Sequence, residues 1–184
     1  MIAMTSPLRT TIALVGLRCS GKSSVGRELA QLVDLPFVDL DEEIVRLHGE
    51  DAPALKEAGD VLASVGVDAF RDLEQRALEA TLDADRICIL ATGGGVIERQ
   101  GNRDLLRERT RCVWLDVEPE ELARRMQADP TSRPALLGGD PVTEIETLLV
   151  RRHPHYAALA ELRLDAGRSS PGDLAGEIAR WLAG

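Results

Sequence analysis

The segment at residues 16–23 reads GLRCSGKS and fills the pattern G-x-x-x-x-G-K-[ST]. It follows an apolar run at residues 12–15 and precedes a stretch with helical periodicity, so the predicted order is strand, loop, helix. Such a loop presents several backbone N–H groups and the positive end of a helix dipole, a combination that binds phosphate. Lys22 is expected to reach the β- and γ-phosphates of a nucleotide, and the Ser23 hydroxyl to ligate Mg²⁺. The sequence therefore predicts a nucleoside triphosphate site, to which the loop and the helix start also contribute Cys19, Ser20, Gly21 and Ser24.

Length and charge limit what else the chain does. Its 184 residues suffice for one substantial core, so we expect a single domain over residues 1–184. The balance of 22 basic and 31 acidic side chains gives a net charge of −9, which argues against nucleic acid or an anionic membrane surface as a partner. No apolar run approaches the roughly 20 residues that span a bilayer. We expect a soluble monomer whose partners are small molecules.

The cysteines indicate the compartment. Cys19, Cys88 and Cys112 show no paired spacing, no C-x-x-C and no histidine at metal-ligand spacing. Unpaired cysteines of this kind are typical of proteins in a reducing environment. We therefore expect a cytoplasmic protein.

Apolar strand-like runs alternate with helical segments along the rest of the chain. Strands are expected at residues 12–15, 37–40, 87–91, 112–117 and 162–165, and helices at 24–33, 70–82, 102–109, 119–127, 143–160 and 173–183. This alternation predicts an α/β fold with an open parallel sheet and helices on both faces. Residues 42–70 are acidic and interrupted by Gly and Pro, and are expected to form a flap of two or three short helices. Residues 128–141, rich in Pro, Gly and Asp, are expected to form a loop.

Chemistry in a parallel sheet gathers at the carboxyl ends of the strands. Here Asp39 and Asp41 end one predicted strand and the glycines at 93–95 follow another. A carboxylate pair facing a magnesium nucleotide can orient the water shell of the metal and accept a proton from a substrate hydroxyl. Consecutive glycines let the backbone approach a ligand closely. A solvated strand end and a plain flexible turn remain the alternatives.

Arginines supply the candidates for binding anions. Arg71, Arg133 and Arg152 could each clamp a phosphate or carboxylate through two parallel hydrogen bonds, although a single arginine is more often a surface residue. Asp116, at the end of the strand VWLD, imitates the metal-binding aspartate of other phosphate-loop enzymes, but we assign it no metal. His153 and His155 receive none either, because a third ligand is missing and alternate helix positions face different ways.

Six blocks in order resemble the signature of shikimate kinases. They are GLRCSGKSS around Lys22, FVDLDEEI at 37–44, FRDLE at 70–74, ATGGGVI at 91–97, RPALL at 133–137 and RRHPHY at 151–156. The resemblance covers nearly the whole chain, and six blocks in order are far more specific than the phosphate loop alone. It implies an adenylate-kinase-like fold with a five-stranded parallel sheet. The activity it implies is ATP- and Mg²⁺-dependent phosphorylation of the 3-hydroxyl of shikimate, giving shikimate 3-phosphate for aromatic amino acid biosynthesis.

The resemblance also assigns roles by position. Asp41 would hold the substrate hydroxyls and act as the base or orienting group, with Asp39 supporting the water shell of Mg²⁺. Arg71 and Arg152 would hold the substrate carboxylate. The ring of the substrate would be closed in by Gly93, Gly94 and Gly95. Arg133 would neutralise the transferring phosphate from a mobile lid at 128–141, and Arg125 would stack on adenine.

The chain departs from the family pattern in three places. Cys19 stands where the fourth loop position is usually glycine, the stretch between Asp41 and Arg71 is longer and lacks the usual G-x-x-I-x-x-I-F wording, and Val67 replaces a glutamate. The loop amides, the helix start and nearby Lys22 would lower the pKa of a thiol at position 19, unless it points away into packing. None of the departures removes a proposed catalytic group.

Two other functions compete with the kinase that the resemblance implies. A related small-molecule kinase such as gluconate kinase uses the same loop, but the triple glycine with Arg71 and Arg152 favours an anionic cyclic acid. A nucleotide-binding regulator without catalysis is the other alternative. A pure binder has no need of the hydroxyl-orienting Asp41, which argues against it.

Overall fold

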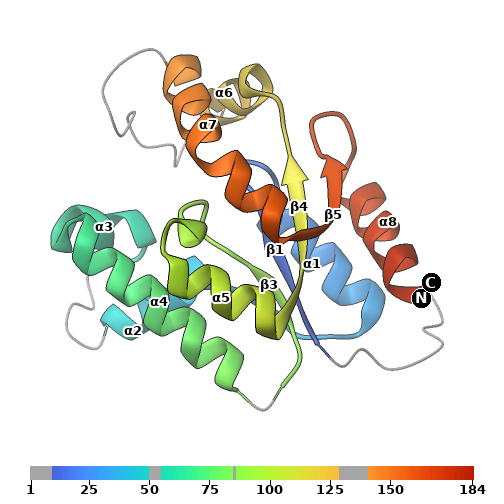
Figure 1. Cartoon of the computed structure of the whole chain (residues 1–184), viewed down its shortest axis with the longest axis horizontal. Coiled ribbons are helices and arrows are strands. Elements are labelled where there is room, and N and C mark those ends of the chain that lie inside the picture. Colours follow the sequence, from blue (N-terminus) through green and yellow to red (C-terminus); the bar gives the residue numbers. More distant parts are fainter. Residues whose placement is uncertain (1–9, 50–54, 85, 129–140) are drawn as a thin grey trace.

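Five parallel strands form the single sheet of this computed structural model, which describes residues 10–49, 55–84, 86–128 and 141–184. The strand order is β2-β3-β1-β4-β5 (Figure 1). The strands are β1 (Thr11–Val15), β2 (Phe37–Asp39), β3 (Ile89–Ala91), β4 (Thr110–Asp116) and β5 (Ala160–Asp165). Every residue of β1 and β3 is buried, because central strands of a parallel sheet are covered on both faces. The predicted α/β fold is confirmed.

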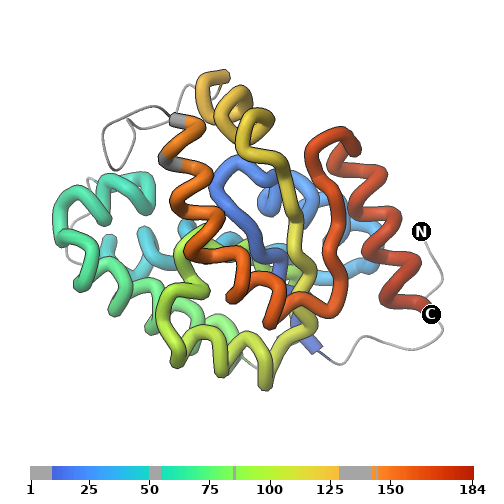
Figure 2. The backbone as a smooth tube through the Cα atoms, turned by 45° about the horizontal axis from the view of Figure 1, so that its top comes forward, coloured from blue at the N-terminus to red at the C-terminus, as the bar shows by residue number. Residues whose placement is uncertain are grey.

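Helices cover both faces of the sheet. On one face α1 (Lys22–Val33) packs against α8 (Pro171–Ala183), while α4 (Val67–Asp83), α5 (Gln100–Arg109) and α7 (Pro141–Leu159) line the other (Figures 1 and 2). The shorter helices α2 (Leu40–Gly49) and α3 (Ala58–Val65) pack on α4, and α6 (Pro119–Ala128) packs on α7. A 3-10 turn, η1 (Val96–Glu98), follows the glycine segment. This arrangement leaves the carboxyl ends of β1, β2 and β3 at one edge.

Several predicted boundaries shift. β2 ends at Asp39 rather than continuing to 40, because the Asp39 carboxylate accepts the backbone N–H of Asp41 and so favours a turn into α2. Asp41 therefore lies in the first turn of a helix and not at a strand end. α4 begins at Val67, ahead of the expected start at 70, so Arg71 lies in its second turn. β3 begins at Ile89, later than the expected 87.

Parts of the predicted flap and lid lie outside the described residues. The flap segment at 42–70 contains most of α2, all of α3 and the first residues of α4, with residues 50–54 not described. Val67, where the family has a glutamate, is 63% exposed at the start of α4. Arg133 and nearly all of the predicted lid fall in the undescribed range 129–140. Among the described helices, none has the length and apolar character that crossing a bilayer requires.

Candidate active site

The phosphate loop connects β1 to α1 and encloses the ammonium group of Lys22. Lys22 is only 8% exposed, and its Nζ donates to the carbonyl oxygens of Gly16 at 3.0 Å and Leu17 at 2.7 Å. Burial lowers the pKa of Lys22 to about 8, against the opposing charges of Asp41 and Asp39. A phosphate entering this loop would meet a largely desolvated cation, whose attraction for an anion is stronger than in water.

Cys19 holds an unusual backbone conformation in the same loop. Its φ of 61° lies in the left-handed region, where a β-carbon costs about 1–2 kcal/mol and glycine is at ease. The Cys19 carbonyl accepts a hydrogen bond from Arg125 Nη1 at 3.4 Å, and the half-buried side chain packs on the core. The loop thus keeps the shape that a glycine would adopt, at some cost in strain.

Iodoacetamide at neutral pH is expected to alkylate Cys19 ahead of Cys88 and Cys112. The latter two thiols are each 1% exposed, and burial raises both pKa values, that of Cys112 to about 11. Mg·ATP should protect Cys19 and shikimate alone should protect it weakly; peptide mapping after brief labelling measures both. Earlier labelling of either buried cysteine, or no effect of ATP, would show that Cys19 replaces a glycine only sterically.

A chain of hydrogen bonds joins α1 to α2. Ser23 Oγ donates to Asp39 Oδ2 at 2.6 Å, and the other oxygen of that carboxylate accepts the backbone N–H of Asp41 at 3.1 Å. Asp39 pairs in register with Ala91 in the sheet, so this chain lies beside the glycine segment that follows β3. Hydroxyl and carboxylate oxygens are the ligands that Mg²⁺ prefers.

The glycine segment after β3 runs close to polar side chains of α2 and α4. A β-carbon on Gly93 would lie 2.9 Å from Glu74 Oε1 and 3.1 Å from Asp41 Oδ1, and one on Gly95 would collide with the Arg71 guanidinium. A side chain at either position would therefore require Glu74, Asp41 or Arg71 to move. The segment brings Asp41, Glu74 and Arg71 together around one stretch of backbone.

Arg71 and Arg152 come from different helices and meet on Glu98. Arg71, in α4, donates from Nη1 to Glu74 at 2.8 Å and from Nη2 to Glu98 Oε2 at 3.2 Å. Arg152, in α7, donates from Nε and Nη2 to Glu98 Oε1 at 2.9 and 2.7 Å, and Arg151 also contacts that oxygen. Arg152 is only 7% exposed. The two arginines predicted to bind a carboxylate thus share a carboxylate of the protein.

The two glutamates of this cluster differ electrostatically. Burial raises the pKa of Glu74, although Arg71 opposes the shift. Burial would also raise the pKa of Glu98, but hydrogen bonding to Arg152 and the charges of the surrounding arginines lower it overall. Glu98 is consequently the firmly ionised partner of the cluster.

Tyr156 links Arg152 to the glycine segment. It lies one turn after Arg152 on α7, and its buried hydroxyl donates to the Gly94 carbonyl at 2.6 Å. Its ring stacks on Trp114 of β4 at a centroid distance of 5.7 Å. Burial raises the pKa of the Tyr156 phenol, which therefore stays protonated as a donor.

Arg125 lies between the phosphate loop and the turn after β5. Its Nε pairs with Glu121 at 2.7 Å, and its Nη2 donates to the carbonyls of Ala166 and Gly167 at 2.8 and 3.0 Å. With the bond to Cys19, these contacts hold the guanidinium plane in place. Such a fixed plane is suited to stacking on a flat ring.

Asp116 and His153, to which the sequence analysis assigned no metal, contact other side chains. The Asp116 carboxylate accepts from Arg163 Nε at 3.0 Å and Nη2 at 2.5 Å. The His153 ring meets Trp114 edge-on at a centroid distance of 5.0 Å. Both therefore belong to the packing around β4 and β5.

Sequence reasoning did not assign Glu74, Glu98 or Tyr156. Glu74 and Tyr156 lie inside two of the sequence blocks that resemble the family, and this position could have marked them as candidate site residues. Glu98 follows the glycine block, but its arginine partners are 27 and 54 residues away in the chain. No local pattern marks such a contact.

The fold and the site define a phosphate-loop kinase of small molecules, with a parallel sheet, a Lys–Ser loop and polar groups at the carboxyl ends of the strands. Residues 18–183 match the family model described as shikimate kinase. The chain belongs to the shikimate kinase family.

Individual relatives agree with this assignment. A shikimate kinase of Caulobacter vibrioides is 40% identical over 163 residues, which cover 88% of this chain and 77% of the relative. The structure of the shikimate kinase from Acinetobacter baumannii in complex with shikimate has a TM-score of 0.85 and 31% identity, covering 96% of this chain and 94% of the other. A gluconokinase from Sinorhizobium meliloti, at 22% identity, TM-score 0.63 and coverage of 97% and 94%, shares the fold alone.

Proposed function

We propose that this protein is a shikimate kinase, which transfers the γ-phosphoryl group of ATP to the 3-hydroxyl of shikimate and gives shikimate 3-phosphate for aromatic amino acid biosynthesis. The observation that carries the proposal is the meeting of Arg71 and Arg152 beside Gly95, within the same cluster of groups as Asp41 and the phosphate loop. A monocarboxylate with ring hydroxyls presents complementary groups to such a site.

Each group has a role in the transfer. The substrate hydroxyl oxygen bonds to the γ-phosphorus, the bond from that phosphorus to the bridging oxygen of ADP breaks, and the hydroxyl proton passes to Asp41. Lys22 stabilises the charge on the phosphates during this step. The exposed carboxylate of Asp41, beside Gly93, supports its role as the acceptor. Arg133 is proposed to neutralise the transferring group, and it lies outside the described residues.

The nucleotide is proposed to bind along the loop and the start of α1, from Cys19 to Ser24, with Arg125 stacking on adenine. Mg²⁺ fits the oxygen donors present, because the Ser23 hydroxyl and the Asp39 carboxylate lie 2.6 Å apart. Ser23 would bind the ion directly and Asp39 through water. Bound with the nucleotide, the ion screens the charge of the phosphates.

Substrate choice separates the proposal from its alternatives. ADP release is measured in a coupled assay with shikimate, with gluconate and with neither. Release that depends on shikimate is the expected result. Faster turnover of gluconate would favour a gluconate kinase. If neither substrate increases ADP release, a regulatory homologue is favoured.

Arg71→Lys is expected to raise KM for shikimate about ten-fold or more, with KM for ATP unchanged. A lysine offers a point charge in place of the planar fork that contacts two carboxylates and lies against Gly95. Initial rates over a grid of both substrates give the two constants. An effect confined to KM for ATP would contradict the role of Arg71 in carboxylate binding.

The protein is further proposed to act as a single-domain monomer in the cytoplasm. Its three cysteines are free, as a reducing compartment would keep them. Light scattering after size exclusion at micromolar concentration measures the mass, and twice the chain mass of 20.0 kDa would contradict the monomer.

A further inference from the structure

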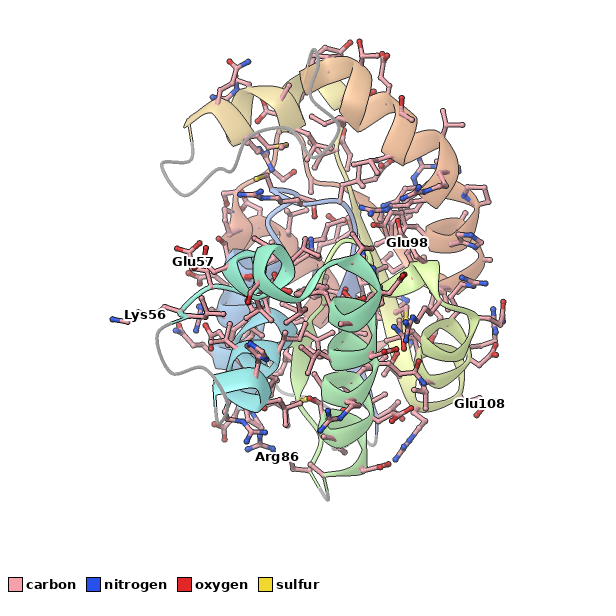
Figure 3. All side chains as sticks on the ribbon, turned by 90° about the vertical axis from the view of Figure 1, so that its left-hand side faces the viewer. Lys56, Glu57, Arg86, Glu98 and Glu108 are labelled. Carbon is pink, nitrogen blue, oxygen red and sulfur yellow. The ribbon has the colours of Figure 1, made fainter. Side chains whose placement is uncertain are left out.

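The carboxylate of Glu98 lies between α4 and α7, both of which contact η1. One oxygen accepts from Arg71 of α4, and the other accepts from Arg151 and Arg152 of α7. Figure 3 shows Glu98 on the inner side of this region, whereas Glu108 of α5 points outward. Each oxygen thus bonds a different helix, and the glutamate spans the gap between them.

The backbone that carries Glu98 is held from both sides. The Glu98 N–H donates to the Gly95 carbonyl at 3.0 Å, and Arg103 Nη1 donates to the carbonyls of Ile97 at 2.6 Å and Glu98 at 2.9 Å. The buried Asn102 amide donates to the Val96 carbonyl at 3.0 Å. These bonds hold the backbone of Glu98 in place, so its carboxylate meets the two arginines from a fixed position.

Arg152 depends on this anion. Among the described residues, Glu98 is the ion-pair partner of Arg152, whose side chain is 9% exposed. A buried guanidinium without a counter-charge is strongly disfavoured, and Arg71 nearby would repel it. Without Glu98, Arg152 would turn toward solvent and the spacing between the two arginines would change.

We propose that Glu98 is a positioning residue for the substrate carboxylate, because it fixes the distance and the orientation between Arg71 and Arg152. This inference rests on the proposed function, in which these arginines bind the carboxylate of shikimate. Glu98 leaves N–H groups of both arginines available to bind the substrate carboxylate. A guanidinium has five N–H groups, and Glu98 takes only Nε and one Nη2 hydrogen of Arg152 and one Nη2 hydrogen of Arg71.

A competing role would have the opposite effect on binding. If Glu98 occupied the place of the substrate carboxylate, shikimate would have to displace it, and removing the charge would strengthen binding. The anchored backbone and the separate use of both oxygens favour positioning instead. The direction of the change in KM therefore decides between the two roles.

The test uses Glu98→Asp, Glu98→Gln and the control Glu108→Gln. Aspartate keeps the charge but is one methylene too short to reach both helices, while glutamine keeps the length and one acceptor oxygen. Glu98→Asp is expected to raise KM for shikimate about ten-fold or more, the loss typical of one misplaced charge-assisted hydrogen bond. Glu98→Gln, which removes the counter-charge of Arg152, should raise KM at least as much as Glu98→Asp. In both variants kcat should stay within about three-fold, KM for ATP should not change, and Glu108→Gln should match the native protein.

Calorimetric titration without ATP gives a second readout. Binding of shikimate should weaken in parallel with KM, whereas binding of its methyl ester, which lacks the carboxylate charge, should respond much less. A lower or unchanged KM in folded Glu98→Asp and Glu98→Gln would overturn the positioning role, and if the aspartate variant fails to fold, Glu98→Gln decides alone. If the native protein does not phosphorylate shikimate, the proposed function fails and this inference fails with it.

Discussion

Lys22→Met is expected to lower turnover at least about 10³-fold while the protein stays folded. The substitution removes the cation that faces the β- and γ-phosphates, where electrostatic stabilisation supplies most of the catalysis. Burial lowers the pKa of Lys22 to about 8, which means that burying the ammonium group costs free energy, although the group stays mostly protonated at neutral pH. Methionine fills similar space without that cost but cannot donate to the carbonyls of Gly16 and Leu17, so we expect the two effects to offset each other and the melting temperature to change little.

Lys56→Met provides the matched control, because Lys56 is the only other lysine of the chain and is exposed (Figure 3). Its turnover should equal that of the native protein in the coupled assay. Native-like turnover of a folded Lys22→Met variant would refute the assignment of the phosphate site.

Asp41→Asn is expected to lower kcat by about 10² or more and to leave ATP binding intact. The amide keeps the shape beside Gly93 and the backbone hydrogen bond to Asp39, but it cannot accept the hydroxyl proton. Steady-state rates with saturating ATP and shikimate measure kcat, and titration with a nucleotide measures binding.

Glu42→Gln is the control for this change, since Glu42 is the next residue of α2 and pairs with Arg27 on the surface at 2.9 Å. It should change kcat little, because an exposed ion pair contributes only about 0–1 kcal/mol to stability and lies apart from the glycine segment. If shikimate turnover survives in Asp41→Asn, another group orients the hydroxyl.

The sequence was informative wherever the chemistry is local. The phosphate loop is one contiguous pattern, because the strand, the turn and the helix that form it are consecutive in the sequence. Asp39 and Asp41 were proposed for the same reason, although α2 begins at Leu40, so that Asp41 lies in a helix and not at a strand end. Helix and strand boundaries shifted because side-chain hydrogen bonds such as that from Asp41 N–H to Asp39 decide them.

Arg71 and Arg152 were proposed from their sequence blocks, but their shared contact with Glu98 was not predicted. The sequence by itself determined the fold class, the phosphate loop and the choice of candidate anion-binding residues, because periodicity and contiguous motifs encode these. Only the tertiary structure decided that Glu98 joins the two arginines, that Gly95 packs on Arg71 and that Cys19 has a left-handed backbone. These features depend on contacts between segments far apart in the chain and on a backbone angle imposed by the surrounding loop, and neither leaves a local pattern in the residues.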